Sequence, residues 1–292
     1  MNINQISPWI DKLEANYIKK VIEKKYLTES NETNKFEKYF QKNFKIKHAV
    51  AISNWTCGIF ACLKALNIGA NDEVIVPNLT FVATINAVIL AGAKPVLCDV
   101  DQENLCINLN LLEKYITKKT KAIIPVHLYG HSCNMEELLK ISKKNKIPII
   151  EDAAQAIFST YGNKFLGSIG ILGGFSFYGN KIITTGEGGI ILTKNTKLRN
   201  KIYEIKNHGR LKKGVFIHDK IGFNFMFTEM QAAIGNVQVK KLKKILKRKE
   251  YIFNIYKKEL SKIKSIKFMK NLPKNKPVHW FTKIFTKDKK KL

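Results

Sequence analysis

Short apolar runs alternate with longer amphipathic stretches along residues 48–193. The runs have the length of buried strands, and we expect strands at 48–53, 73–77, 95–100, 122–127, 148–151, 174–177 and 189–192. The stretches between them predict helices at 57–66, 80–91, 111–118 and 135–144. This alternation is typical of an α/β fold in which helices cover both faces of a mostly parallel sheet. Such sheets bind ligands beyond the carboxyl ends of their strands.

The two ends of the chain have a different pattern. The first 45 residues are polar with apolar residues at helical spacing, which predicts N-terminal helices. A long amphipathic helix is expected from about Thr228, and the chain beyond Tyr251 is rich in lysine and closes on KDKKKL. We therefore expect a large domain over residues 1–239 and a smaller, lysine-rich, partial C-terminal domain over 240–292.

The charge balance disfavours one class of function. The chain has 292 residues and a formal net charge of +28, yet only Arg199, Arg210 and Arg248 are arginines. Proteins that read nucleic acids rely on arginine for paired contacts to bases and phosphates. A nucleic-acid-binding protein is therefore the lowest-ranked alternative. The lysine excess instead favours the attraction of small anionic substrates.

Location and metal content follow from what the sequence lacks. No apolar run is long enough to span a bilayer, and the N-terminus has no basic segment followed by an apolar one. The five cysteines are odd in number and have no CxxC spacing. We expect a cytoplasmic protein without a membrane segment, a metal site or a disulfide scaffold.

Three segments carry candidate chemistry. Lys181 lies in the glycine- and hydroxyl-rich segment GFSFYGNKIITTGEGG, Asp152 follows the apolar run IPII, and SNWTCG (53–58) turns from a strand into a helix. Taken alone, Lys181 is most simply a surface charge, Asp152 a helix cap and SNWTCG an ordinary helix start. Together they match pyridoxal phosphate, which needs a lysine for its aldehyde, an acid beside its ring nitrogen and a cradle for its phosphate.

The chain resembles the DegT/StrS group of pyridoxal phosphate-dependent nucleotide-sugar aminotransferases. The resemblance covers about residues 10–239. It rests on SNWTCG, NDEVIVPNLTFVATINAV, GAKPVLCDVD, KAIIPVHLYG, IIEDAAQA, GFSFYGNKIITTGEGGI, NHGR and GFNFMFTEMQAAIG. It implies an aspartate-aminotransferase-like (type I) large domain with a mostly parallel seven-stranded sheet, and a homodimer with the active site at the subunit interface.

The run FYGNKIITTGEGG is similar to members of the group that act on GDP-linked sugars. It implies transfer of an amino group from L-glutamate to GDP-4-keto-6-deoxymannose, giving GDP-perosamine, a step of polysaccharide biosynthesis. The sequence leaves open which sugar, nucleotide and carbon position are used.

The resemblance also implies roles for the cofactor's ring and aldehyde contacts. Lys181 matches the lysine that binds the cofactor covalently, and Asp152 matches the acid that pairs with its ring nitrogen. Gln155 matches the residue that hydrogen-bonds its phenolic oxygen. Phe81 matches the aromatic residue stacked on the ring, with a plain core residue as the alternative.

Phosphate contacts are implied at a second group of residues. Thr56 with the neighbouring backbone at Trp55, and Ser176, match contacts from the same subunit. Asn224 matches a contact that the neighbouring subunit offers. Tyr178 and Asn180 are expected to line the sugar pocket, His127 is interpreted as structural, and His208 is left without a role.

Departures from the group define an alternative. Trp55 stands where the group usually has glycine, so its indole is expected either to point away from the phosphate or to crowd the site. Met226 and Phe227 replace an Arg–Met pair. The segment PVHWFTKIF (277–285) resembles the first strand of the group's small domain, and the chain ends soon after it. The alternative is a catalytically impaired, C-terminally truncated homologue with a structural or dimerising role.

Overall fold

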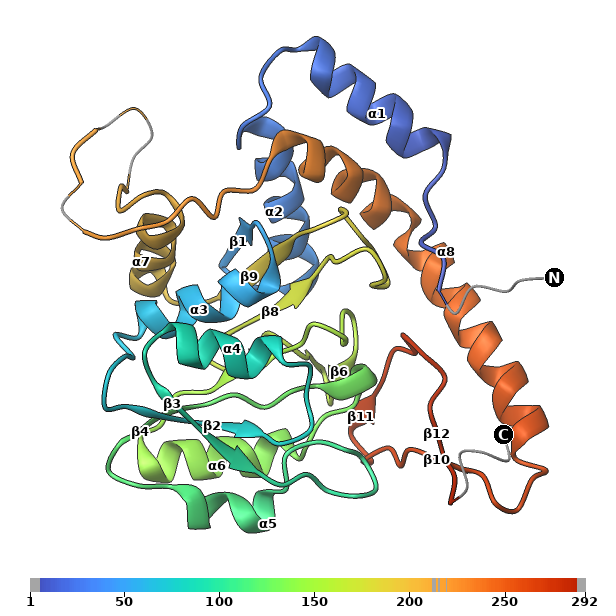
Figure 1. Cartoon of the computed structure of the whole chain (residues 1–292). Helices are drawn as coiled ribbons and strands as arrows, with labels where there is room; N and C mark the ends of the chain where they lie inside the picture. The colour runs from blue at the N-terminus through green and yellow to red at the C-terminus, as the bar shows by residue number, and fades with distance from the viewer. Residues whose placement is uncertain (1–5, 212–213, 215, 219, 288–292) are drawn as a thin grey trace.

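The computed structural model describes residues 6–211, 214, 216–218 and 220–287. Its main strands form two hydrogen-bonded ladders, ordered β1-β9-β8-β5 and β3-β2-β4 (Figure 1). Their bounds are β1 His48–Ile52, β2 Glu73–Pro77, β3 Lys94–Cys98, β4 Thr120–Ile123, β5 Ile150–Asp152, β8 Leu172–Ser176 and β9 Gly189–Thr193. Each of the seven predicted strands therefore overlaps a strand of the structure.

The strand directions are mostly parallel. β2 runs parallel to β3 and β4, and β5 runs parallel to β8, whereas β9 is antiparallel to both β8 and β1. Two isolated parallel bridges, Ile123 with Ile149 and Val126 with Asp152, connect the two ladders. The strand predicted at 122–127 is shorter in the structure, where β4 ends at Ile123. The backbone of Pro125 faces β5, and because Pro125 has no N–H to donate, the pairing on that side is limited to isolated bridges.

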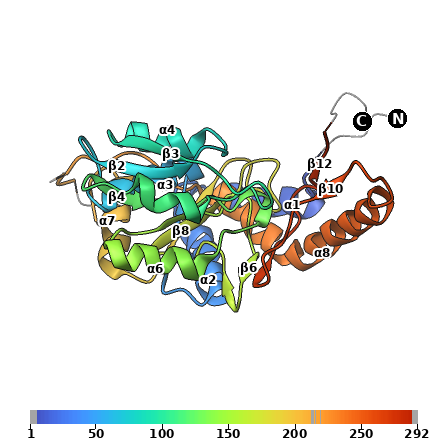
Figure 2. The same ribbon diagram turned by 90° about the horizontal axis from the view of Figure 1, so that it is seen from below.

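Apart from the edge strand β3, the main strands are largely buried on both faces, and the alternation of side chains along them separates two cores. Ala49 and Ala51 of β1 belong to one hydrophobic cluster, while Val50 and Ile52 belong to the other. Helices α2 (Asn31–Phe44) and α6 (Met135–Asn145) contribute to the first cluster, whereas α3 (Trp55–Ala65), α4 (Ala83–Leu90) and α7 (Thr196–Lys206) contribute to the second. Figure 2 shows the sheet between these helical layers.

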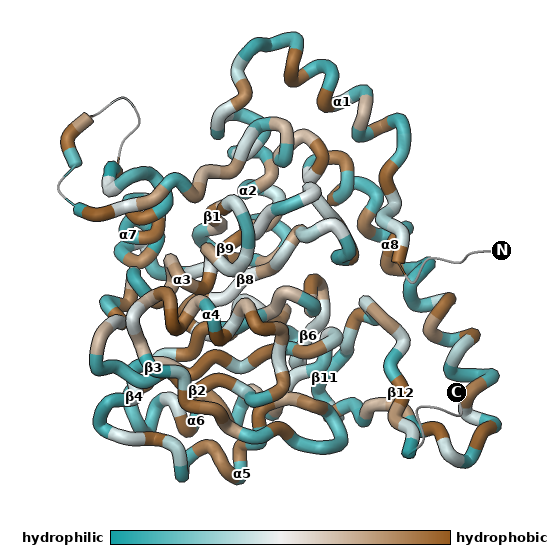
Figure 3. The backbone as a smooth tube through the Cα atoms, in the orientation of Figure 1, coloured by the Kyte–Doolittle hydropathy of each residue, from teal (hydrophilic) through white to brown (hydrophobic). Residues whose placement is uncertain are grey.

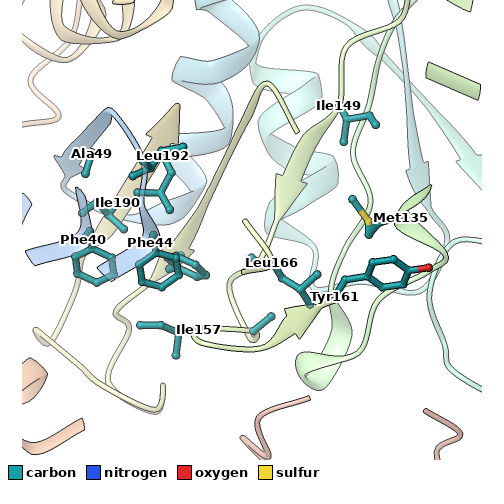
Figure 4. Close-up of a cluster of buried hydrophobic side chains, with 14 of the residues drawn as sticks. Phe40, Phe44, Ala49, Met135, Ile149, Ile157, Tyr161, Leu166, Ile190 and Leu192 are labelled. Atoms are coloured by element: carbon teal, nitrogen blue, oxygen red, sulfur yellow. The ribbon is translucent and has the colours of Figure 1, made fainter. Parts of the chain in front are cut away.

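The first core is rich in aromatic rings. Figure 4 shows Phe40 and Phe44 of α2 close to Ala49, Ile190 and Leu192 of β1 and β9. The two phenylalanine rings stack with their centroids 5.5 Å apart. The tube in Figure 3 is brown through much of α3, α4 and β2, whereas α1 (Lys12–Glu23) and α8 (Glu229–Leu260) alternate between teal and brown. This contrast separates buried elements from amphipathic surface helices.

Helix α8 links the N-terminal helices to the end of the chain. It begins at a capping box formed by Thr228 and Gln231, and Lys241 pairs with Glu14 of α1 at 2.6 Å. Figure 1 shows α8 leaving the sheet and extending toward the C-terminal segment. The domain boundary predicted at residues 239 and 240 falls inside this continuous helix.

The remaining elements are short. They are α5 (Leu109–Leu112), the 3₁₀ helices η1 (Glu113–Tyr115) and η2 (Leu128–Gly130), and the strands β6 (Thr160–Tyr161), β7 (Lys164–Phe165), β10 (Lys267–Phe268), β11 (Asn275–Lys276) and β12 (Ile284–Phe285). The helix predicted at 111–118 is wrong in its bounds, because Asn108 caps a start at Leu109 and Thr117 turns the chain into β4. Within the described residues, no helix has the length and apolar character that a membrane crossing requires.

The C-terminal segment returns to the sheet. β11 pairs with β6, and β12 pairs with β10. Only Ile284 and Phe285 of the predicted strand at 277–285 are extended in a ladder. The residues before them cross instead to the carboxyl ends of the main strands, where the Val278 amide donates to Ser159 Oγ at 2.9 Å.

Candidate active site

A buried carboxylate stands at the carboxyl end of β5. The Asp152 side chain is held by three donors: Trp55 Nε1 to Oδ1 at 2.8 Å, the Ala154 amide to Oδ1 at 3.1 Å, and Thr84 Oγ1 to Oδ2 at 2.7 Å. Asp152 is only 5% exposed. A carboxylate at this depth is stable because hydrogen-bond donors replace the water it has lost.

Asp152 forms the floor of a cavity of about 320 Å³. The walls come from the N-terminus of α3, the start of α4, the ends of β5 and β8, and the C-terminal segment. The lining residues are Asn54, Trp55, Thr56, Thr80, Phe81, Ala83, Thr84, Val126, Asp152, Ala154, Gln155, Ser176, Tyr178, Asn180, Lys181, Glu187 and Trp280. Seven of the eight predicted site residues are in this set, and Asn224 is outside it.

Lys181 supplies an amine on the same cavity. Burial lowers the pKa of Lys181 to about 8, although the charge of Asp152 acts in the opposite direction. Its Nζ lies 4.0 Å from the centroid of the Trp280 ring. An amine with this pKa is partly neutral near physiological pH, and a neutral amine is the form that attacks a carbonyl carbon.

The N-terminus of α3 makes one pole of the cavity suited to an anion. The Asn54 side chain caps the helix by accepting from the Cys57 amide at 2.9 Å. The amides of Trp55 and Thr56 precede the first intrahelical hydrogen bond, so they have no helical acceptor. Together with the Ser176 hydroxyl, these groups offer donors and a positive helix end to a phosphate.

Two further predicted residues lie toward the opening. The Gln155 side chain accepts from the Tyr129 amide at 2.8 Å, which fixes the orientation of its carboxamide. Phe81 is 70% exposed at the cavity, so its interpretation as a plain core residue is wrong. Tyr178 and Asn180, which were expected to line the sugar pocket, line this cavity.

The remaining candidates lie elsewhere. Asn224 is exposed, and its backbone forms an isolated bridge with Asn207. His127 is buried, and its Nε2 lies 2.8 Å from Glu151 Oε2, in agreement with a structural role. His208 has a left-handed backbone with φ of 56° and does not line the cavity. Phe227, in the Arg–Met position of the group, is fully buried against Phe36.

Thr84 and Trp280 are two of the lining residues that were not predicted from the sequence. Thr84 is buried at the start of α4 and bonds Asp152, but a threonine within an apolar run indicates only a helix interior. Trp280 comes from the segment after α8, and its Nε1 donates to the Asn180 carbonyl at 2.7 Å. The sequence contains one hint of a role for Trp280, which is that the aromatic run VHWF stands within an otherwise lysine-rich segment.

Comparisons with known proteins agree with this geometry. Residues 8–292 match the DegT/DnrJ/EryC1/StrS aminotransferase family model. The chain is 38% identical to the GDP-perosamine synthase of Escherichia coli O157:H7, covering 86% of this chain and 69% of that protein. It is also 38% identical to the GDP-perosamine synthase of Caulobacter vibrioides, covering 89% of this chain and 71% of that protein.

A solved structure shares the fold. The PLP form of Spr1654 from Streptococcus pneumoniae superposes with a TM-score of 0.92 at 25% sequence identity. The match covers 98% of this chain and 79% of that chain. The α/β architecture described above is therefore the type I fold of these enzymes. From the family match and the cavity that holds Lys181 and Asp152, the chain belongs to the DegT/DnrJ/EryC1/StrS aminotransferase family.

Proposed function

We propose that this chain transfers an amino group from L-glutamate to a GDP-linked 4-keto-6-deoxy sugar, with GDP-4-keto-6-deoxymannose as substrate and GDP-perosamine as product. One observation carries the proposal: Lys181, Asp152 and the N-terminus of α3 line a single cavity. The identity of 38% to two GDP-perosamine synthases supports the choice of sugar and nucleotide. The alternative of a catalytically impaired homologue is not favoured, because the reactive lysine and its partner acid are both present and adjacent to the same cavity.

The cofactor is pyridoxal phosphate, and the described residues fit it. The cavity of about 320 Å³ has room for a substituted pyridine ring with a phosphate arm. Asn180 Oδ1 is buried with no hydrogen-bond partner among the described residues. A buried polar atom without a partner is costly, so a donor from a bound molecule is expected beside it.

The proposed contacts follow the chemistry of each pole. Asp152 would accept from the ring nitrogen, Lys181 would bind the aldehyde carbon, Gln155 would hydrogen-bond the phenolic oxygen and Phe81 would cover the ring face. The phosphate contacts are the amides of Trp55 and Thr56 and the hydroxyls of Thr56 and Ser176. When bound, the cofactor supplies an electron sink that stabilises the negative charge left on a deprotonated substrate carbon.

The chain's own residues then handle the protons. Asp152 holds a proton at the ring nitrogen through its carboxylate, which keeps the ring electron-poor. With the cofactor bound, the Lys181 Nζ would hold and move the proton between the substrate carbon and the carbon that carried the aldehyde. Its pKa of about 8 allows it to accept and donate this proton near neutral pH.

A second hollow adjoins the cavity and provides room for a large substrate. It measures about 830 Å³ and shares Thr80, Phe81, Gln155 and Trp280 with the cavity. Lys283 is one of the residues that line it, and burial lowers the pKa of its amine to about 8. We propose that this hollow receives the nucleotide-linked sugar.

Assembly and organisation are part of the same proposal. The enzyme acts as a cytoplasmic homodimer, and Asn224 of each subunit completes the phosphate site of the other. The exposure of Asn224 outside its own cavity supports this role. The two ladders act as one mostly parallel seven-stranded sheet within a domain of residues 1–239, and residues 240–292 belong to a smaller unit.

The test is a mass-spectrometric assay of the purified protein with pyridoxal phosphate. L-glutamate is combined with a panel of GDP-, UDP- and dTDP-linked 4-keto-6-deoxy sugars. We expect a glutamate-dependent amino sugar from the GDP-linked substrate and none from the Lys181→Ala variant. Product from a UDP- or dTDP-linked sugar alone would overturn the nucleotide assignment, and absence of product from every sugar would overturn the proposed activity.

A further inference from the structure

The indole of Trp55 lies beneath the cavity, not in its opening. Trp55 is 4% exposed and packs in the hydrophobic cluster that includes α3 and α4. Its Nε1 donates to Asp152 Oδ1, so the indole is directed toward the acid and away from the phosphate end of the cavity. This is one of the two orientations that the sequence allowed. The larger side chain at this position leaves the cavity open.

Two glycines make the space that the indole fills. A Cβ atom at Gly58, one turn further along α3, would lie 2.5 Å from Trp55 Cε3. A Cβ atom at Gly174, on β8, would lie 2.4 Å from Trp55 Cζ3. Real Cβ atoms do not approach other atoms this closely, so a side chain at either glycine would displace the indole. At Gly174 the Ile190 carbonyl oxygen, 2.0 Å from such a Cβ atom, excludes a side chain as well. The indole is thus held in one position from two sides.

This position directs the indole N–H at Asp152. Trp55 Nε1 and the Ala154 amide both donate to Oδ1, and a carboxylate oxygen offers about two acceptor positions. Oδ1 is therefore saturated. Oδ2 accepts from Thr84 Oγ1, its one donor among the residues that the structure describes, so Oδ2 retains an acceptor position for a donor in the cavity.

We propose that Trp55 is a positioning residue, whose indole N–H fixes the Asp152 carboxylate so that Oδ2 faces the ring nitrogen of the cofactor. The inference rests on the proposed function, because it assigns a role toward that cofactor. Hydrogen bonds to a charged group are stronger than those between neutral groups. Removing this donor leaves the Asp152 carboxylate held only by the Ala154 amide and Thr84 Oγ1, so its orientation is less strictly fixed. Pre-organisation of an acceptor contributes to affinity for its ligand.

The test measures binding of pyridoxamine phosphate, which has the same ring nitrogen and phosphate but no aldehyde to react with Lys181. Dissociation constants are determined by equilibrium dialysis for the full chain and for Trp55→Phe, in wild-type and Asp152→Ala backgrounds. We expect Trp55→Phe to raise the dissociation constant roughly tenfold or more in the wild-type background. In the Asp152→Ala background the same change should alter it less than about twofold, because the group to be positioned is gone.

A second variant moves the indole without changing it. Gly58→Ala places a methyl group against Trp55 Cε3 and displaces Nε1 from Asp152, so it too should weaken binding in the wild-type background. Trp9→Phe is the matched control, since Trp9 is 37% exposed and lies over Lys244 away from the cavity. Circular dichroism establishes that each variant is folded.

The outcomes separate this inference from the proposed function. Equal effects of Trp55→Phe in both backgrounds, or unchanged binding in Trp55→Phe and Gly58→Ala, would show that Trp55 only fills space and would overturn the positioning role. Failure of the wild-type protein to bind pyridoxamine phosphate would instead overturn the proposed cofactor site. If Trp55→Phe does not fold, Gly58→Ala in the two backgrounds decides the question alone.

Discussion

The ammonium nitrogen of Lys181 lies 4.0 Å from the centroid of the Trp280 ring. The two residues are far apart in the chain, and the ring is fixed by the bond from its Nε1 to the Asn180 carbonyl at 2.7 Å. The C-terminal segment therefore covers the amine that the rest of the site is built to use. The burial that results is the main cause of the lowered pKa of Lys181.

This burial predicts the pH dependence of cofactor capture. The neutral form of an amine attacks an aldehyde, so the rate at which the cofactor-free protein binds pyridoxal phosphate should rise with pH through a midpoint near the Lys181 pKa of about 8. Stopped-flow absorbance between pH 6 and pH 10 measures this midpoint. Because the charge of Asp152 raises the pKa, Asp152→Asn should move the midpoint to lower pH. A wild-type midpoint near the ordinary lysine pKa would contradict the lowered pKa of Lys181.

The role of Trp280 is tested by removing its ring. Trp280→Leu lets water reach Lys181, and since burial is the largest cause of the shift, the midpoint of cofactor capture should rise toward the ordinary lysine value. Trp280→Phe keeps an aromatic cover and should leave the midpoint closer to that of the wild type. Phe281→Leu is the neighbouring control. A midpoint that falls in Trp280→Leu would mean that the attraction between the cation and the ring outweighs burial.

The sequence was informative where chemistry coincides with the ends of strands. Asp152, Ser176 and Thr56 follow or end apolar runs, and parallel strands bring such residues to one edge, so their convergence on one cavity could be predicted. Trp280 could not be placed this way, because its segment has neither strand nor helix periodicity and reaches the site through contacts made over a long sequence separation. The two-residue strands β6, β7, β10 and β11 were missed because they are too short to show periodicity.

Helix α7 shows a different limit. Asn195 caps it by accepting from the amides of Lys197 and Leu198, and Leu198 and Ile202 are buried at helical spacing. These signals were present in the sequence, but the stretch is mostly polar and resembles a solvated loop. The buried core on that side of the sheet decides its structure, and a single sequence does not display that packing.

The pair of Glu151 and His127 predicts a stability effect separate from catalysis. Glu151 is fully buried, with Oε1 accepting from the amides of Ile169 and Gly170 and Oε2 accepting from His127 and the Gly167 amide. In Glu151→Gln, the new NH₂ group faces at least one backbone amide donor wherever it points. We expect the free energy of unfolding of the cofactor-free protein to fall by about 3 kcal/mol. Urea unfolding followed by circular dichroism measures it.

The matched control for this prediction is Glu113→Gln. Glu113 pairs with Lys144 at 2.8 Å on the surface, where both side chains are largely in water. That substitution should change the free energy of unfolding by less than about 0.5 kcal/mol. Similar losses in the two variants would contradict the role of the buried hydrogen bonds.

The proposed exchange of Asn224 between subunits predicts complementation. Lys181→Ala and Asn224→Ala affect different subunits of one composite site, so a hybrid dimer contains one site with both wild-type residues. Mixing equal amounts of the two variants under conditions that exchange subunits should restore up to about a quarter of wild-type activity. Native mass spectrometry verifies that hybrids form. If hybrids form but the mixture is no more active than the average of the two variants measured separately, Asn224 does not contribute to the neighbouring site.

The fit between Trp55 and Gly58 predicts a substitution whose effect changes sign. The nearest atoms to a Cβ at Gly58 all belong to the Trp55 side chain, at 2.5, 2.9 and 3.5 Å. In the wild-type background, Gly58→Ala should therefore lower the free energy of unfolding by about 1–3 kcal/mol through overpacking. In a Trp55→Ala background the obstacle is absent, and alanine in a helix interior is favoured over glycine by up to about 1 kcal/mol. Urea unfolding of the four proteins gives both values, and a loss of stability on Gly58→Ala in each background would mean that the indole is not what requires the glycine.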